Sequence, residues 1–471
     1  SPTGALVLDL SKTTHSHIFI SNQSNNMMKP FFKKHKLSSF QIILFGFALL
    51  ILFGGALLML PIATKDGQGA PFLDAIFTAT SATCVTGLIV HDTALYWSGF
   101  GQAVLLVLIQ IGGMGVVTIA ICFATFSGRK IGLMQRSVMQ ESIAAPHLGG
   151  IVRLTKFIFK ATLCIELAGA LALYPTFCKA FGILKGAWYA LFHSISAFCN
   201  AGFDLMGVRS PSSSLTSFAD HPTVNMTIMF LIIIGGLGFL TWDDIRRHGF
   251  HFRKYYMQSK VILCTTLLLL ILPTIYFYFY EYASVGGSSR FWLSLFQSVT
   301  PRTAGFNTAD LSQLSEAGQT IMILLMLVGG SPGSTAGGMK TTTFAVLFAS
   351  AAAVFKRSEE TRLFHRSISP KVVRSAATIL LLYLTLLLTG SLVISCVEKI
   401  PLITCVFEAA SALCTVGLTL GITAQLSAIS QWILILLMFL GRIGALTLVF
   451  ATLAPAKNAL SRYPQERITV G

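Results

Sequence analysis

Four short segments of the chain each carry a glycine that follows small or hydroxyl-bearing residues. They read TSATCVTGLIV, SAFCNAGFDL, SVTPRTAGFNT and SALCTVGLTL, and superposing them places Gly87, Gly202, Gly305 and Gly417 in one column. Glycine accepts positive φ without steric cost, which lets successive backbone carbonyls face one side. Rings of carbonyls from four such segments can replace the hydration shell of a potassium ion. The predicted chemistry is therefore coordination of a monovalent cation by backbone oxygens, for which no carboxylate is needed.

Each candidate ion-binding segment comprises the glycine and the three residues before it. Short helices leading into the segments would add partial negative charge at their C-terminal ends. Taken singly, each segment could be a plain turn between helices, but four in register favour a common site. The candidate potassium-binding residues are Cys84, Val85, Thr86 and Gly87; Cys199, Asn200, Ala201 and Gly202; Arg302, Thr303, Ala304 and Gly305; and Cys414, Thr415, Val416 and Gly417.

A second glycine-rich stretch, GGSPGSTAGGMKTTT at residues 329–343, interrupts an apolar segment. Proline removes a backbone donor and glycine weakens a helix, so a helix cannot continue through it. We expect a flexible barrier beneath the ion-binding segments. Met339 separates Gly338 from Lys340, so the stretch does not match a phosphate-binding loop, and no nucleotide or other cofactor is expected on this chain. The candidate gating residues are Gly329, Gly330, Pro332, Gly333, Gly337, Gly338, Lys340 and Arg442.

The elements that must position these residues are long apolar stretches. Of 471 residues, 54% are hydrophobic and 11% are charged, whereas soluble domains carry about 25% charged residues. About 20 apolar residues cross a bilayer as a helix, so we expect an all-α polytopic membrane protein with eight transmembrane helices. Four shorter apolar stretches lie between them and are interpreted as re-entrant pore helices. The eight long segments are 38–62, 97–125, 156–178, 221–242, 258–280, 318–355, 372–396 and 426–453.

Lysine and arginine placement predicts the orientation. Twenty-five of the 34 basic residues lie in the N-terminal arm, the C-terminal tail and three alternate connections, 126–160, 243–260 and 356–374. Basic residues favour the cytoplasmic side, so we expect a multi-pass protein of the cell inner (plasma) membrane with both termini cytoplasmic. The same asymmetry accounts for the formal net charge of +16 and makes nucleic-acid binding an unfavoured interpretation.

The four segments repeat with spacings of 115, 103 and 112 residues. Each repeat begins and ends on the cytoplasmic side, so the repeats run parallel and can surround one pseudo-fourfold pore. Because Met27 and Met28 precede a basic stretch and the first span, we expect translation to begin at one of them and residues 1–26 to be a disordered or artefactual extension. The predicted units are an N-terminal arm 1–37, repeats 38–125, 156–242, 258–355 and 372–453, and a tail 454–471.

The four segments resemble those of the Trk/Ktr/HKT superfamily of potassium transporters, which have four M1–P–M2 repeats in one chain, and the bacterial Ktr type is most similar. The resemblance implies potassium uptake through a channel-like pore, sometimes coupled to or activated by sodium. It also implies a homodimer on a cytosolic ring of RCK/KTN-type nucleotide-binding regulatory subunits. Plant relatives that transport sodium carry serine at the position of Gly87, so this glycine favours potassium. The cysteines at 84, 199 and 414 depart from the family's more usual hydroxyl, Asn or Gly residues.

The sequence is compatible with more than one role for several side chains. The three cysteines are either packed in the interior or accessible thiols, in which case small thiol reagents would slow transport. Lys340 either reaches the cytoplasmic surface or takes part in gating, and Arg442 is expected to hold the glycine-rich loop. Glu166 either stabilises the packing of neighbouring helices or belongs to an ion path.

Two other function classes can be compared with the sequence. An intramembrane enzyme would need a nucleophile with a base or a metal cluster, and the sequence offers isolated polar residues instead. The alternative kept open is a secondary transporter of sodium or another monovalent cation.

Overall fold

The structure, a computed structural model, describes residues 38–116, 118–120, 132–143 and 150–444. The predicted N-terminal arm with its extension, the tail at 454–471 and the ends of the second and eighth apolar segments lie outside these ranges.

Four long helices begin the four predicted repeats. They are α1 (Ser39–Leu58), α7 (Ile151–Phe181), α11 (Met257–Tyr276) and α15 (Pro370–Glu398). A π-helical turn, Phe277–Glu281, extends α11. By length and composition, each of the four could cross a membrane. Their mostly apolar residues explain the helices, since an apolar segment of this length satisfies its backbone only within a helix when no water is near.

A shorter helix follows each long one and leads into a glycine segment. These helices are α2 (Phe72–Cys84), α8 (Ile183–Phe198), α12 (Gly287–Val299) and α16 (Leu402–Leu413). Each packs against the long helix before it. All four are shorter than the roughly 20 residues that a spanning helix needs, as the sequence predicted.

In each group the third helix ends or bends close to a glycine. α4 (Gly99–Met114) ends at Gly115, α9 (Pro222–Leu237) bends by 94° at Gly238 into α10 (Phe239–His248), and α17 (Ala428–Ile443) ends at Gly444. α13 (Glu316–Leu327) and α14 (Thr341–Phe355) flank the glycine-rich loop. The sequence analysis anticipated only the last of these breaks, and treating 221–242 as one continuous span was wrong. The three additional glycines have φ of +86°, +90° and +88°, a conformation that a right-handed helix cannot contain.

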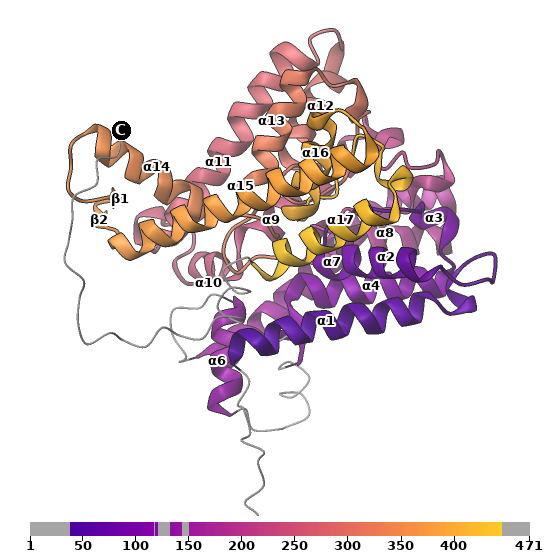
Figure 1. The fold of residues 1–471 in the computed structure, drawn as a ribbon, viewed down its shortest axis with the longest axis horizontal. Coiled ribbons are helices and arrows are strands. Elements are labelled where there is room, and N and C mark those ends of the chain that lie inside the picture. Colours follow the sequence, from indigo (N-terminus) through magenta and orange to yellow (C-terminus); the bar gives the residue numbers. More distant parts are fainter. Residues whose placement is uncertain (1–37, 117, 121–131, 144–149, 445–471) are drawn as a thin grey trace, which may run out of the picture. The chain divides into compact units, whose positions relative to one another are not determined.

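Contacts between the groups form a closed circuit. The third helix of one group packs on the short helix of the next: α4 on α8, α9 on α12, α13 on α16, and α17 back on α2. Figure 1 follows this order from the indigo helices α1, α2 and α4 to the yellow α17, which returns beside α2. The glycine segments, which follow the short helices, are thereby brought together in the interior.

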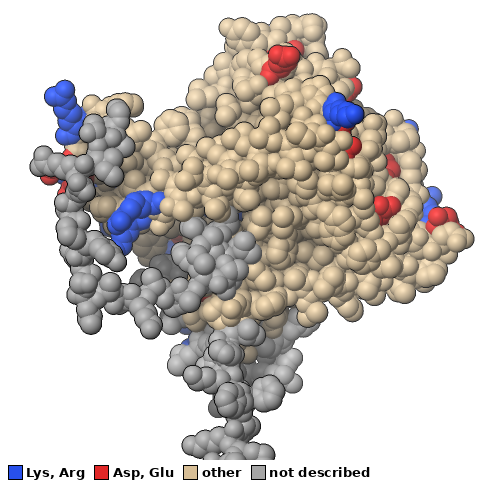
Figure 2. Space-filling model, in the orientation of Figure 1, with Lys and Arg blue, Asp and Glu red and all other residues tan. Residues whose placement is uncertain are grey.

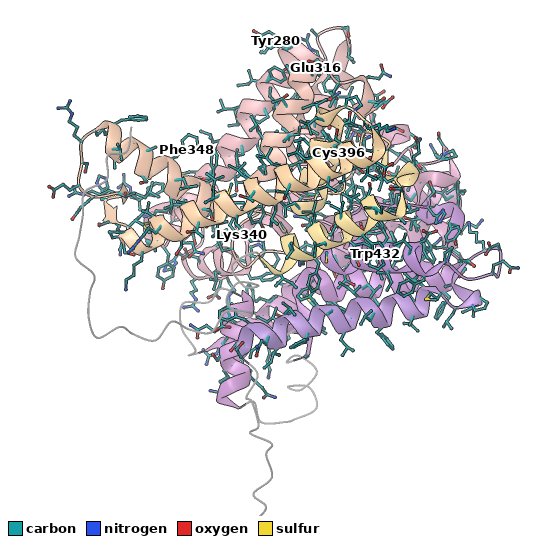
Figure 3. All side chains as sticks on the ribbon, in the orientation of Figure 1. Tyr280, Glu316, Lys340, Phe348, Cys396 and Trp432 are labelled. Carbon is teal, nitrogen blue, oxygen red and sulfur yellow. The ribbon has the colours of Figure 1, made fainter. Side chains whose placement is uncertain are left out.

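The surface over the long helices is apolar. Figure 2 shows an uncharged face over α15, α17 and α1, with the visible charged residues toward its two ends. Leu49, Leu171 and Leu381 are 70%, 72% and 68% exposed, and Figure 3 shows Tyr280, Phe348 and Trp432 on the outside. A broad exposed apolar belt between polar ends fits contact with lipid, because a soluble monomer rarely exposes so large a patch.

The remaining elements are small connections. A two-stranded antiparallel ribbon precedes α15. The short helices and strands are α3 (Thr93–Tyr96), α6 (Leu133–Ile143), β1 (Arg362–Leu363), β2 (Arg366–Ser367) and 3-10 turns at Pro61–Ala63, Met206–Val208, Thr216–Phe218, Phe252–Lys254, Leu311–Gln313 and Thr423–Gln425.

Candidate ion pathway

The four column glycines form a ring in chain order. A Cβ built on Gly87 would lie 2.5 Å from the carbonyl oxygen of Ala201, and one on Gly202 would lie 2.8 Å from that of Ala304. The circuit closes because Gly305 abuts the carbonyl of Val416 and Gly417 abuts that of Thr86. Each glycine thus touches the residue that precedes the next glycine. Any side chain here would strike backbone of the neighbouring segment, which explains the residue type.

The backbone of each segment alternates the sign of φ. The glycines have positive φ, and so does the residue two positions earlier: Val85 at 58°, Asn200 at 59°, Thr303 at 67° and Thr415 at 52°. The residue between them does not. Left-handed φ is uncommon for residues with a side chain. Its recurrence at the same position shows that the four segments share one specific backbone conformation. Alternation of this kind turns successive peptide groups to the same side.

Hydroxyl side chains hold the segments from behind. The hydroxyl oxygen of Ser81 accepts from the Gly87 N–H at 3.1 Å, and that of Ser411 accepts from the Gly417 N–H at 3.0 Å. Ser196 occupies the same position in the second segment and donates to the Phe203 carbonyl. The third segment has Val299 there, and Thr300 donates to the Phe306 carbonyl at 2.5 Å. The sequence analysis missed this role, although a serine six residues before the glycine recurs in three of the four segments.

The carbonyl oxygens of these segments have no such partners. Among the described residues, none donates a hydrogen bond to the carbonyl of Cys84, Cys199, Arg302 or Cys414, or to that of the three residues after each. Val85, Thr86, Asn200, Ala201 and their counterparts are nonetheless 0–1% exposed. A buried carbonyl without a partner costs free energy comparable to a lost hydrogen bond. So many at one place indicate a site built for a cation.

Two cavities lie on opposite sides of the glycine ring. All four glycines border one of about 150 Å³, together with Asp92, Asp204 and Asn307. The other, of about 260 Å³, is bordered by the glycine-rich loop and by Gly115 and Gly444. In the first, burial and, secondarily, the Asp92 carboxylate raise the pKa of Asp204 to about 7. Within the described ranges no cluster of three or more His, Cys, Asp or Glu could hold a metal ion.

The glycine-rich loop, predicted at 329–343, spans residues 328–340 in the structure because α14 already begins at Thr341. It lies against the ring. A Cβ on Gly329 would contact Thr303, and Gly337 and Gly338 abut Thr415 and Cys414. In contrast to the ring, this loop has most of its carbonyls bonded. The Phe239 N–H donates to Gly333 and the Gly329 N–H to Met339, both at 2.8 Å. The loop therefore contacts the ring and also borders the second cavity, and it bonds more of its own carbonyls than the ring does.

Two cationic side chains donate to further carbonyls of the loop. Lys340 Nζ donates to the Ala336 carbonyl at 2.8 Å, and Arg442 donates to that of Thr335. The Arg442 guanidinium also donates to the carbonyls of Gly112 and Gly113, where α4 ends. Both side chains border the inner cavity, and Figure 3 shows Lys340 on the loop before α14. Lys340 thus bonds its own loop, and Arg442 joins the loop to the first group.

Arg442 stands in a column of glycines that the sequence analysis missed. The third helices end in GG-x-G at residues 112–115 and 235–238 and in GR-x-G at residues 441–444. The first glycine of each packs on a carbonyl of the short helix, so Gly112, Gly235 and Gly441 abut Thr83, Phe198 and Leu413. The second position is Gly113, Gly236 or Arg442. Only the last repeat places a side chain at this depth.

The side chains at the third position before each column glycine lie away from the ring's open carbonyls. Cys84, Cys199 and Cys414 are 0% exposed, which favours the packing interpretation of the thiols. Arg302 is 4% exposed and donates to the Thr266 hydroxyl of α11 at 3.3 Å. In all four residues of this column the side chain is packed in the interior, and the backbone carbonyl is the group left without a hydrogen-bond partner.

Glu166 supports the second segment from behind. It accepts from the Gln110 amide at 3.2 Å and lies 3.9 Å from the Cys199 sulfur. The residue is 2% exposed, so it joins α7, α4 and the second segment. This geometry favours the helix-packing interpretation.

Comparisons with known proteins assign the chain to a family. The sequence profile of the TrkH family, described as a cation transport protein, matches residues 39–461. The potassium/sodium uptake protein NtpJ of Enterococcus hirae is 41% identical, over 93% of this chain and 98% of that protein. The Ktr system potassium uptake protein B of Bacillus subtilis is 39% identical, over 92% and 96%.

A solved structure has the same fold. The potassium transporter TrkH from Vibrio parahaemolyticus superposes with a TM-score of 0.71 at 22% identity, covering 90% of this chain and 86% of that one. The relatives are transport proteins and not enzymes. The chain belongs to the TrkH family of cation transport proteins.

Proposed function

We propose that this chain takes up potassium through a channel-like pore whose selectivity filter is the ring of four glycine segments. The observation that carries the proposal is the set of buried carbonyls without hydrogen-bond donors around Gly87, Gly202, Gly305 and Gly417. Dehydrating a potassium ion requires replacement oxygens on several sides, and four segments surrounding one axis supply them. The names of the relatives, which describe potassium or potassium/sodium uptake, support the choice of ion.

The pore belongs to a larger architecture that we propose from the sequence. Four parallel repeats, residues 38–125, 156–242, 258–355 and 372–453, supply eight transmembrane helices and four re-entrant pore helices. The closed circuit of contacts between successive groups supports this pseudo-fourfold arrangement. The excess of basic residues in alternate connections places both termini in the cytoplasm. The cavity next to Asp92 and Asp204 then faces outside, and the cavity next to Arg442 faces inside.

The loop at 328–340 is the proposed gate. It lies between the ring and the inner cavity, and Arg442 and Lys340 hold it by its carbonyls. A cation at this depth also repels a passing ion, so the arrangement described is closed. We propose that a homodimer of this chain docks on a cytosolic RCK/KTN-type nucleotide-binding subunit that moves the loop, and that sodium modulates uptake. The alternative is a secondary transporter of sodium or another monovalent cation, favoured only by the sodium in the name of one relative.

Potassium-limited growth and rubidium uptake test the proposal. The chain is expressed, with a cognate regulatory subunit, in a bacterium lacking its own potassium uptake systems. The test variant is Gly305→Ser, because a Cβ there would strike the Val416 carbonyl. The matched control is Gly67→Ser, at a glycine that also has positive φ but has nothing within 4 Å of its Cβ position.

The parent and Gly67→Ser should restore growth and rubidium uptake, while Gly305→Ser should lose uptake or admit sodium. Immunoblots of the membrane fraction would establish equal expression. Uptake of sodium but not rubidium by the parent would contradict potassium as the substrate and favour the alternative transporter. Unaltered uptake in Gly305→Ser would contradict the carbonyl ring as the filter.

A further inference from the structure

A cavity of about 520 Å³ lies away from the ring and the loop, where α7 and α11 begin beside α10. Its lining comes from three elements that the chain brings together from residues 150–154, 240–247 and 256–259. It adjoins two of the three basic connections that the sequence assigns to the cytoplasm. Neither the ion pathway nor the proposed gate uses any of its residues.

Two helices begin at this cavity, and neither N-cap residue caps its helix with its own side chain, although the Asp244 carboxylate accepts from the N-cap N–H of α11. The N-cap residues of α7 and α11 are Gly150 and Tyr256, and neither makes a side-chain capping hydrogen bond. The first backbone N–H groups of a helix have no partner within it and carry partial positive charge. Both helices are long, with 31 and 20 residues. Two such ends at one cavity favour an anion between them.

Three arginines line the same cavity: Arg153, Arg246 and Arg247. Asp243 bonds Arg246 at 2.9 Å and Arg247 at 2.6 Å through its two carboxylate oxygens. One carboxylate therefore serves two guanidiniums, each of which keeps further donors. Arg153 has no ion-pair partner among the residues that the structure describes.

The second carboxylate in the lining does not neutralise the remaining positive charge of the three arginines. Asp244 is 2% exposed. One of its oxygens contacts His248 Nδ1 at 2.8 Å, and the other accepts from the Tyr256 N–H at 2.9 Å. Both oxygens are thus engaged within the protein, and the cavity presents more positive than negative charge.

Buried hydroxyls complete the lining. Ser259 and Thr241 border the cavity and are 4% and 1% exposed. Within the described residues, neither hydroxyl has a hydrogen-bond partner. A buried hydroxyl usually has a partner, so these two are free to donate to a bound group. These hydroxyls support a binding site independently of the arginines and the helix ends.

From these contacts we infer that the cavity binds a phosphate group, held by Arg153, Arg247, the N–H groups at the starts of α7 and α11 and the Ser259 hydroxyl. Arginine matches phosphate oxygens in a bidentate fork. The phosphate can belong to an anionic phospholipid headgroup or to a soluble phosphate compound, since both present the same oxygens. In either case an occupied site would clamp α7, α10 and α11 together.

Thermal unfolding of the purified full-length chain tests the site. In one arm the protein is placed in nanodiscs of phosphatidylcholine with or without phosphatidylglycerol. In the other, phosphatidylcholine nanodiscs receive sodium phosphate or ATP, with sodium chloride of equal ionic strength as the reference. The variants are Arg153→Gln, Arg247→Gln and Ser259→Ala. The matched control is Arg253→Gln, an exposed arginine of the same region that does not line the cavity.

The expected result is a rise in Tm with one class of probe, and a loss of about tenfold in apparent affinity for each arginine variant, since each removes a charge-assisted contact. Arg253→Gln should keep the parent's response. A response to phosphatidylglycerol alone identifies a lipid headgroup, and a response to phosphate or ATP alone identifies a soluble ligand. A parent that responds to none of the probes, or variants that all respond like the parent, would overturn the inference. The readout does not use ion transport, so it is independent of the proposed function.

Discussion

The two glycine-rich regions of this chain treat their backbone carbonyls in opposite ways. In the ring around Gly87, Gly202, Gly305 and Gly417, serine hydroxyls accept from the N–H groups of Gly87 and Gly417, and the carbonyls accept nothing from the described residues. In the loop at 328–340, backbone N–H groups, the Ser334 hydroxyl, Lys340 and Arg442 bond most of the carbonyls, whereas those of residues such as Gly329 and Gly338 accept nothing from the described residues. Glycine composition alone therefore does not define an ion site. What matters is whether the protein leaves the carbonyl oxygens for an ion or bonds them itself.

The two regions also differ in what confines their glycines. Each ring glycine faces backbone of the next segment, whereas Gly330 of the loop faces the Ala336 side chain. The ring contacts form a closed circuit, so a shift at one glycine disturbs all four segments, whereas the loop contacts, including that of Gly329 with the Gly337 carbonyl, close no such circuit. The comparison predicts a rigid ring and a loop that can change conformation.

The largest expected effect is at the ring. Gly417→Ser should reduce rubidium uptake by tenfold or more, on the order of the loss expected when a ring of coordinating carbonyls is displaced, because its Cβ would strike the Thr86 carbonyl. Gly330→Ser, the same change in the loop, should leave potassium over sodium selectivity intact. Competition of sodium with radioactive rubidium measures both properties. Equal selectivity losses in the two variants would remove the distinction between ring and loop.

The second largest effect on rubidium flux is expected at Arg442, which donates hydrogen bonds to the loop. Arg442→Gln should raise rubidium flux in proteoliposomes that contain no regulatory subunit, by about tenfold, since charged hydrogen bonds contribute about 1.5–3 kcal/mol. Arg442→Lys keeps the charge but loses the fork that spans Thr335 and Gly112, so it should fall between the two. If Arg442→Gln conducts no more than the parent, the arginine does not hold the loop closed.

A smaller effect is expected behind the ring. Ser411→Ala removes the acceptor of the Gly417 N–H, a contact worth about 1 kcal/mol, and should lower potassium over sodium selectivity by about fivefold. Ser196→Ala is the matched comparison, because Ser196 donates to the Phe203 carbonyl and not to a glycine N–H. We expect the larger loss at Ser411 in competition assays. A larger loss at Ser196 would show that support of the glycine N–H is not what matters.

The smallest effect is a pH dependence at the outer cavity. The pKa of Asp204 is raised to about 7, so its carboxyl is neutral in acid and charged in alkali. Uptake from dilute potassium should therefore rise about twofold as external pH increases through 7, because the charged form attracts cations. Asp204→Asn should flatten the profile. Asp310→Asn serves as the control, since hydrogen bonds from Ser312 lower the pKa of Asp310 and keep it charged throughout. A profile that Asp204→Asn leaves unchanged would assign the titration elsewhere.

Much of the fold could be read from the sequence because its signals are local. Apolar length predicted the long helices, and the shared position of Gly87, Gly202, Gly305 and Gly417 predicted that these residues act together. The breaks at Gly115, Gly238 and Gly444 were missed, although GG-x-G recurs. A single glycine is tolerated in a helix, so the residue type alone did not predict the positive φ found at these three positions. The support from Ser81 and Ser411 was missed for the same reason, since a hydroxyl's partner depends on how the chain turns.

Anomalous scattering from rubidium tests the central claim most directly. The protein would be crystallised in rubidium chloride, and the anomalous difference map calculated at the rubidium edge. Our account predicts peaks on the axis of the ring, among the carbonyls of Thr86, Ala201, Ala304 and Val416, and their loss in Gly305→Ser. Peaks located only at carboxylates, or an ordered ring without anomalous signal in saturating rubidium, would contradict it.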